Sequence, residues 1–427
     1  MIATVAANTG FGRGCLTIVV LGCLIGSGHA GQNRAPAPAT PAQPVKSSFA
    51  QAVISDDERK LLADAKHGRF ATIPFAEAAL IASGVTEPAQ RRRYLERLAA
   101  LETQASAAVG NTASPLERGE RLLAWLYSGA GPLASVAPRK RPKYKPSQTS
   151  LAVLLDSGSY NCVSATVIYN LIGRRLGLNL RAIEVPTHVF SILDLGDQRV
   201  DVETTTPRGF NPVRDKQALQ EFQEMTGFVY IPARQRKKQR DIDEAALIGA
   251  IFYNRGVDAF RSKRHGEAFR YSVLAQRLDP LLAGASGNAN AALSRWAGEA
   301  AAAGDIDLAL EIVDRHVPAL ADRGTETKMI LIAYQYRAAQ ASKARDWASV
   351  ADIYVSGWRR HAKDERLAGT LQRNALAAYD NWAQPLKKAG RWAEAIAVYQ
   401  GALKTLPDNR HLLDQLKFCQ QRQRTSP

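Results

Sequence analysis

The sequence lacks the short motifs by which metal and nucleotide sites are commonly identified. It contains no Cys-x-x-Cys pattern, no His-Glu-x-x-His pattern and no glycine-rich phosphate-binding loop. Three of its seven histidines, His265, His361 and His411, are dispersed over the C-terminal half. We therefore expect no metal centre and no cofactor, and no recognisable nucleic-acid-binding motif is present.

Cysteine is also scarce, with four residues in 427, and two of these lie in an N-terminal segment that has the features of an export signal. Arg13 precedes an apolar run from Cys15 to Ile25, and small residues follow as far as Ala30. This order is typical of a signal peptide over residues 1–30, and the run is too short and glycine-rich for a comfortable membrane span. We expect cleavage near Ala30 and an exported, periplasmic or secreted protein, with lipidation at Cys23 or a retained anchor as alternatives. No other segment is apolar enough to cross a membrane.

Acidic residues are few relative to basic ones, which gives the chain a net charge of +16. Such an excess favours acidic surroundings, so an anionic cell-envelope surface is a candidate partner. The two dense basic runs, over residues 139–145 and 234–240, fall where loops or linkers are expected. We interpret them as solvated connecting segments, and we expect no specific nucleic-acid partner.

The remaining chain divides by composition and pattern into four parts. Residues 31–48 are rich in Ala and Pro and predict a flexible linker. Residues 49–232 begin with helical patterns and continue into a mixed segment of helix and strands, and residues 233–243 form a basic linker. Residues 244–427 are Ala-rich and helical, so the sequence as a whole predicts an α+β domain followed by an α-helical array.

Two segments of the C-terminal part resemble each other. They are YNRGVDAFRSKRHGEAFRYSVLAQRLDP and NWAQPLKKAGRWAEAIAVYQGALKTLP, which end at Pro280 and Pro407. Small residues at helix contacts, an aromatic residue and a closing proline resemble the tetratricopeptide repeat. That resemblance implies stacked helix pairs that bind a protein or peptide partner on a concave face, with an irregular helical domain as the alternative.

The mixed segment contains the residues that could carry chemistry. Apolar residues at helical spacing follow Cys162 and end at Gly177, so Cys162 is expected at the start of a helix. A helix N-terminus favours a thiolate by on the order of 0.3–1 kcal/mol. His188 opens a strand and is the candidate base for this nucleophile. The expected strands cover residues 180–185, 188–195 and 198–205.

The acid that would orient His188 can be chosen from the register of the last two strands. A tight turn at Gly196-Asp197 places both Glu203 and Asp201 on the face of the sheet that carries His188, because side chains alternate. Glu203 is then the diagonal neighbour of His188, roughly 7 Å or less away between Cβ atoms, whereas Asp201 lies one step further. We prefer Glu203, with Asp201 as the alternative that a one-residue bulge would bring forward.

The segment YNCVSATVIYNLIGRRLGLNLRAIEVPTHVFSILDLGDQRVDVETT resembles the core of the transglutaminase-like superfamily. The resemblance covers about residues 150–212 and rests on Cys162 at a helix start, Gly177-Leu178 at its end, His188, and Glu203 with Thr205. It implies a papain-like fold with a Cys-His-acid triad. Tyr160 stands where many members have Gly, Phe190 stands where they usually have Trp, and the acid is more often Asp.

The sequence leaves open which group would donate a hydrogen bond to an oxyanion. The backbone N–H of Cys162 is available at the helix start. Asn161 could add an amide but is equally a helix cap, and we favour the cap. Cys419 is interpreted as a packing residue on a terminal helix, and no disulfide to Cys162 is expected.

Two functions follow. The first is a thiol peptidase, amidase or acyltransferase that acts on amide bonds through Cys162, His188 and Glu203, with the helical repeats recruiting a protein. The second is an inert transglutaminase-like scaffold whose repeats act as a protein-binding adaptor.

Overall fold

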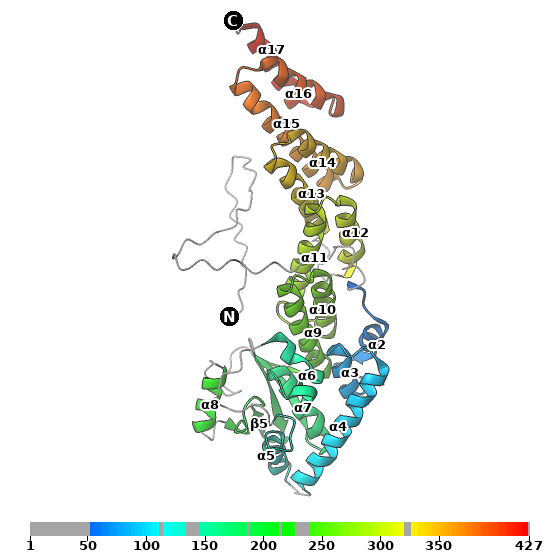
Figure 1. Ribbon diagram of the computed structural model, residues 1–427, viewed down its shortest axis with the longest axis vertical. Coiled ribbons are helices and arrows are strands. Elements are labelled where there is room, and N and C mark those ends of the chain that lie inside the picture. Colours follow the sequence, from blue (N-terminus) through cyan, green and yellow to red (C-terminus); the bar gives the residue numbers. More distant parts are fainter. Residues whose placement is uncertain are drawn as a thin grey trace. The chain divides into compact units, whose positions relative to one another are not determined.

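The structure is a computed structural model that describes residues 52–110, 114–133, 145–185, 188–212, 216–226, 239–319 and 326–425. The expected signal peptide, the Ala/Pro-rich linker and most of both basic runs lie outside these residues. The described chain is mostly helical with small antiparallel sheets, in agreement with the α+β class. It divides into two compact units, residues 52–292 and 293–425 (Figure 1).

The first unit combines helices with two antiparallel sheets. Its elements in chain order are α2 (Asp56–Asp64), β1 (Ala65–Lys66), β2 (Arg69–Phe70), α3 (Phe75–Ala82), α4 (Pro88–Val109), α5 (Pro115–Leu126), the 3-10 helix η2 (Pro146–Thr149), α6 (Leu151–Ser157), α7 (Cys162–Arg175), β3 (Leu180–Val185), β4 (His188–Asp194), β5 (Arg199–Val202), α8 (Lys216–Thr226), β6 (Arg240–Ile242), α9 (Glu244–Arg261) and α10 (His265–Leu278).

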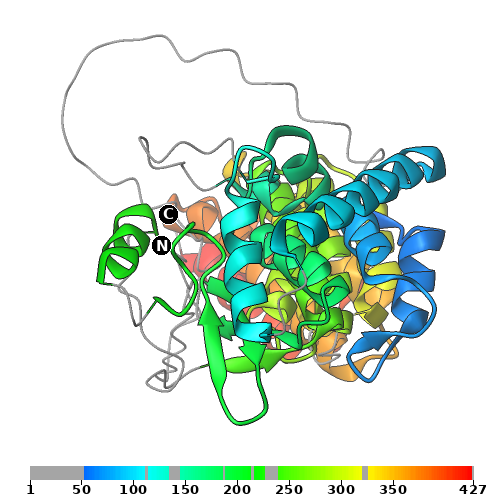
Figure 2. The same cartoon turned by 90° about the horizontal axis from the view of Figure 1, so that it is seen from below.

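The larger sheet has the strand order β5-β4-β3-β6, and all its pairs are antiparallel. Its strands, green in Figure 2, lie beside the helices of the first unit. The β3 and β4 strands begin where the sequence predicted them, and β5 is shorter than expected because it ends at Val202. In place of an unstructured linker end, residues 240–242 form β6, where Arg240 contacts both Glu184 and Asp279. These last residues of the expected linker 233–243 are thus part of the sheet.

Helix α7 forms the centre of the first unit. Every residue from Val163 to Gly173 is buried, and the helix packs against β4, α5 and α9. Burial on all faces distinguishes a central helix from a surface helix, which has one apolar stripe. The first residue of α7 therefore has a fixed position relative to the sheet.

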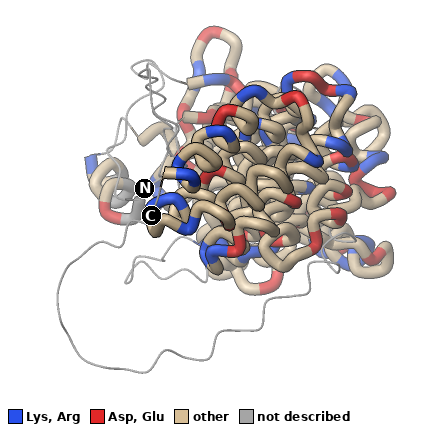
Figure 3. Tube along the Cα trace, turned by 90° about the horizontal axis from the view of Figure 1, so that it is seen from above, with Lys and Arg blue, Asp and Glu red and all other residues tan. Residues whose placement is uncertain are grey.

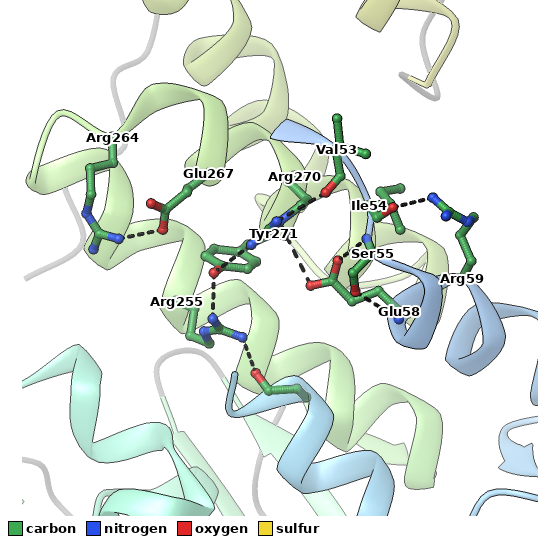
Figure 4. Close-up of polar contacts among 11 residues, drawn as sticks. Val53, Ile54, Ser55, Glu58, Arg59, Arg255, Arg264, Glu267, Arg270 and Tyr271 are labelled. Atoms are coloured by element: carbon green, nitrogen blue, oxygen red, sulfur yellow. Dashed lines mark hydrogen bonds and ion pairs between the residues drawn. The ribbon is translucent and has the colours of Figure 1, made fainter. Parts of the chain in front are cut away.

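The helix pair α9–α10 is part of this first unit, although the sequence predicted a repeat domain beginning at residue 244. The compact boundary falls at residues 292 and 293, inside α11. Arg255 on α9 donates to the carbonyl oxygen of Ala82 at 2.6 Å and to the Tyr271 hydroxyl at 2.5 Å. Figure 4 shows Arg270 beside the same tyrosine, reaching the Val53 carbonyl and the Glu58 carboxylate. The pair thus holds segments of the N-terminal helices.

The second unit contains helices with short connections. From α12 to α17, each helix packs against the next. They are the end of α11 (Ala285–Ala302), α12 (Ile306–His316), the 3-10 helix η5 (Val317–Ala319), α13 (Glu326–Lys343), α14 (Trp347–Arg360), α15 (Glu365–Lys388), α16 (Trp392–Thr405) and α17 (Arg410–Thr425). The small residues and the tyrosine of the second repeat-like segment, Ala395, Tyr399 and Ala402, are fully buried. Cys419 joins that core, as predicted for a packing residue.

Charged residues of both signs are interspersed along the described helices, as Figure 3 shows. Within the described ranges, no single helix is long and apolar enough to cross a membrane. Only α6 and α7 taken together, with a bend of 84° between them, reach that length and composition.

Candidate active site

Cys162 is the first residue of α7, and Asn161 caps this helix as predicted. The Oδ1 atom of Asn161 accepts hydrogen bonds from the N–H groups of Val163 at 2.9 Å and Ser164 at 3.2 Å. The Ser164 hydroxyl accepts in return from the Asn161 N–H at 3.0 Å. This reciprocal capping box fixes the helix start and the position of Cys162. The thiol side chain is neither fully buried nor fully exposed.

His188 opens β4, and its imidazole contacts the carboxylate that the register favoured. The Nε2 atom of His188 lies 2.6 Å from Oε2 of Glu203. The β4–β5 ladder pairs Ile192 with Asp201, as the tight turn predicted, and continues without a bulge to Val202. Glu203 follows the last paired residue, so the pairing places it diagonally from His188. Asp201 lies one step further, opposite Ile192.

Glu203 is held by its own loop. Its side chain is fully buried, and Oε1 accepts from the Thr205 N–H at 3.1 Å and from the Thr205 hydroxyl at 2.6 Å. Its backbone N–H donates to the carbonyl oxygen of Gly209 at 2.8 Å. A Cβ atom at Gly209 would lie only 1.8 Å from the Glu203 carbonyl oxygen, so this return of the chain requires glycine. Both carboxylate oxygens of Glu203 therefore have partners, as a buried charge requires.

The electrostatics of the three groups favour an ionised pair. Burial alone would lower the pKa of His188, but the Glu203 charge and hydrogen bonds to Cys162 and Glu203 raise that pKa to about 10. Burial opposes ionisation of Glu203, yet His188 and the Thr205 hydrogen bonds lower the pKa of this carboxyl. At neutral pH we therefore expect an imidazolium between a carboxylate and the thiol.

The contact between the Cys162 thiol and the imidazole completes the arrangement. The thiol of Cys162 is one of the groups that raise the pKa of His188, so the two side chains are neighbours. Because Nε2 of His188 is engaged by Glu203, Nδ1 is the ring nitrogen left for the thiol. Nucleophile, base and orienting acid thus follow one another, which is the arrangement that covalent catalysis by a thiol needs.

Two tyrosines beside the acid were not predicted as site residues. The Tyr127 hydroxyl donates to the carbonyl oxygen of Thr204 at 2.9 Å and lies 3.0 Å from the Tyr160 hydroxyl. Burial, followed by the neighbouring phenol and the Glu203 charge, raises the pKa of Tyr127 well above its usual value, and burial also raises that of Tyr160. On α7, the Thr166 hydroxyl lies 3.0 Å from that of Thr204. These contacts tie the loop of Glu203 to α5 and to α7.

A second set of contacts stabilises the capped N-terminus of α7. The Ser164 hydroxyl donates to the carbonyl oxygen of Gln148 at 2.6 Å, and the Gln148 amide donates to the Ser159 hydroxyl at 3.1 Å. The neighbouring residue, Thr149, accepts from the Asn254 amide at 3.2 Å. Because Asn254 lies on α9, the first repeat-like helix contributes directly to the support of the site.

No protein-family model, no curated protein and no solved structure matches this chain. Among the described residues, no group of three or more His, Cys, Asp or Glu side chains is placed to hold a metal ion. Both described cysteines are free, and burial raises the pKa of Cys419.

Proposed function

We propose that the chain is a transglutaminase-like thiol enzyme that acts on amide bonds through Cys162, His188 and Glu203. The observation that carries the proposal is the His188–Glu203 pair, with its fully buried carboxylate, next to a thiol at the N-terminus of α7. A buried charge pair is costly to maintain, and a perturbed pKa beside a nucleophile is characteristic of functional sites.

In the proposed reaction, Cys162 Sγ attacks the carbonyl carbon of an amide and forms a tetrahedral intermediate. The thiol proton is held by His188, which passes it to the departing amine as the C–N bond breaks and a thioester forms. Water or a second amine then attacks the thioester, gives a proton to His188 and releases the acyl group. Water makes the enzyme a peptidase or amidase, and an amine makes it an acyltransferase.

Glu203 holds the imidazole and stabilises its charge throughout these steps, as its two-sided hydrogen bonding allows. The helix start supplies a donor for the oxyanion. Asn161 satisfies the N–H groups of Val163 and Ser164, whereas the Cys162 N–H has no acceptor among the described residues. It is therefore free to bind the developing negative charge.

The helical array of the second unit is proposed to recruit a protein or peptide partner in the manner of tetratricopeptide repeats. Its consecutive packed helices and the buried small residues of α16 support this assignment. We further propose that the protein is exported and that its basic charge favours an anionic cell-envelope surface.

The test is the pH dependence of alkylation by iodoacetamide, read at Cys162 by peptide mapping of the full chain. Cys419 is an internal control, because it is fully buried. We expect alkylation of Cys162 to persist well below pH 8 and to slow in a His188→Ala variant. A Cys162 that reacts slowly and does not respond to His188 would contradict the enzyme and leave the adaptor function, which pull-downs with the repeats would then test.

A further inference from the structure

Only one of the two polar atoms of the Asn161 side chain is hydrogen-bonded among the described residues. Its Oδ1 atom accepts two hydrogen bonds in the helix cap, but its Nδ2 atom is buried and has no partner among the described residues. The residue as a whole is only 6% exposed. An amide donor that is buried without an acceptor is destabilising and rare in native proteins. An ionised aspartate would cap the helix equally well and has no donor, so the cap alone does not explain asparagine here.

The unused donor lies next to the nucleophile in the chain. Asn161 directly precedes Cys162, whose own backbone N–H is without an acceptor among the described residues. The cap fixes the carboxamide plane over the first turn of α7, with Oδ1 on the N–H groups of Val163 and Ser164. The Nδ2 atom is the second polar atom of the same planar carboxamide. One capping interaction thus holds two unsatisfied donors at the start of the helix that carries the nucleophile.

We infer that Asn161 is a catalytic residue whose Nδ2, together with the Cys162 N–H, binds the oxyanion formed when Cys162 attacks a carbonyl group. The inference rests on the proposed function and names a residue that serves as both cap and donor. A negatively charged oxygen supplies the acceptor that Nδ2 lacks in the free protein. Donors fixed before the reaction need no reorganisation when the charge develops, which is the property that makes them effective.

Two thiol reactions separate this role from a structural one. Acylation by p-nitrophenyl acetate forms the Sγ–C bond of a thioester, breaks the ester C–O bond and releases p-nitrophenolate, while His188 holds the thiol proton. It passes through a tetrahedral oxyanion. Alkylation by iodoacetamide displaces iodide from an sp³ carbon and forms no oxyanion. Only acylation should depend on Asn161 Nδ2, whereas both reactions depend on the thiolate.

The variants are Asn161→Ser and Asn161→Asp in the full chain. Both keep an oxygen that caps the helix. Serine is neutral but retains a short hydroxyl donor, and aspartate has no donor when ionised but adds a charge. The matched control is Asn409→Ser, because Asn409 caps α17 in the other unit through the same Oδ1 contact, at 3.1 Å from the Leu412 N–H.

We expect the rate of the p-nitrophenolate burst to fall about 100- to 1,000-fold in Asn161→Ser, as for loss of one oxyanion donor. Alkylation of Cys162 should change less than threefold in that variant, and Asn409→Ser should match the wild type in both reactions. A wild-type burst rate in Asn161→Ser and Asn161→Asp would overturn the inference and leave the proposed enzyme intact. Equal losses of acylation and alkylation would overturn it too, since they would place the effect on the thiolate. A wild-type protein without a burst would defeat the proposed function and this inference together.

Discussion

The ion pair of His188 and Glu203 makes a quantitative prediction for the substitution Glu203→Gln. The pKa of His188 is about 10 in the folded protein, against an ordinary value of 6.5. The difference corresponds to on the order of 5 kcal/mol of preference for the imidazolium, to which Glu203 is the leading favourable contributor. Without that charge, only the contact with Cys162 opposes burial, so the pKa of His188 should fall.

Two consequences follow, and each has its own measurement. A tenfold fall in the imidazolium population at pH 6.5 requires the pKa of His188 to drop to about 5.5, which is the loss of more than the whole of this preference. Because Glu203 is the leading favourable contributor, we expect iodoacetamide alkylation of Cys162 at pH 6.5 to slow by up to about tenfold in Glu203→Gln. Glutamine preserves the shape of the side chain and its hydrogen-bonding capacity, which limits the change to the charge. Alkylation at the wild-type rate would refute the reasoning, because the imidazolium would then not depend on Glu203.

The second consequence is a pH-dependent loss of stability. The raised pKa of His188 contributes stability that is present in full below about pH 6.5 and is lost as the pH rises through about 10. The lowered pKa of Glu203 contributes stability that is present above its ordinary pKa of 4.5 and is lost on acidification below it. Glu203→Gln should therefore destabilise the first unit most between pH 5 and 6.5, by about 3–5 kcal/mol, and much less at pH 10. Hydrogen exchange of α7 amides at the two pH values measures this difference, and a deficit that is equal at both would contradict it.

The other predictions concern the supports of the site. In Gly209→Ala, the new Cβ would overlap the Glu203 carbonyl oxygen and displace the acid, so both the p-nitrophenolate burst and alkylation of Cys162 should fall at least about tenfold. The control Gly129→Ala should keep wild-type rates, because nothing lies within 4 Å of the added atom. A chain that ends at residue 292 should keep the burst with p-nitrophenyl acetate, whereas one that ends at residue 243 should lose it with the removal of α9. Equal activity of the two truncated chains would show that α9 is dispensable.

The parts of the site that the sequence predicted are those fixed by local geometry. Strand alternation and a two-residue turn are enough to place Glu203 diagonally from His188, provided that the ladder has no bulge, and it has none. The start of α7 follows from Asn161 and the apolar spacing after it, because helix caps act over three or four residues. These interactions join residues that are close in sequence, so the pattern of residue types is enough to predict them.

The parts that it missed depend on contacts between residues distant in sequence. Tyr127 lies on the segment after α5 and reaches Thr204 only because both elements pack around α7. Strand β6 consists of Arg240, Asp241 and Ile242 at the end of a basic run, where three residues carry no alternation to predict a strand. Its pairing with β3 is stabilised instead by the contacts of Arg240 with Glu184 and Asp279.

The boundary between the two units shows that a repeat-like local pattern does not decide to which unit a helix pair belongs. The repeat-like spacing of Gly256, Ala268 and Ala275 describes the contact between α9 and α10, where a Cβ at Gly256 would lie 3.1 Å from the Ser272 hydroxyl. It contains no information about the remaining faces of α9. One of those faces carries Asn254 and Arg255, whose polar groups bind Thr149 and the Ala82 carbonyl.

In this chain, polar side chains of α9 that bond to residues outside the α9–α10 pair therefore indicate the domain boundary better than the repeat-like spacing does. An arginine that is largely removed from solvent needs acceptors, and those of Arg255 lie on α3 and on α10. Burial lowers the pKa of that guanidinium, so its hydrogen bonds to the Ala82 carbonyl and the Tyr271 hydroxyl are needed to keep it in place. A helix that satisfies its polar groups on two partners packs against both, which is why α9 can resemble a repeat helix in sequence and still be a structural element of the proposed catalytic unit.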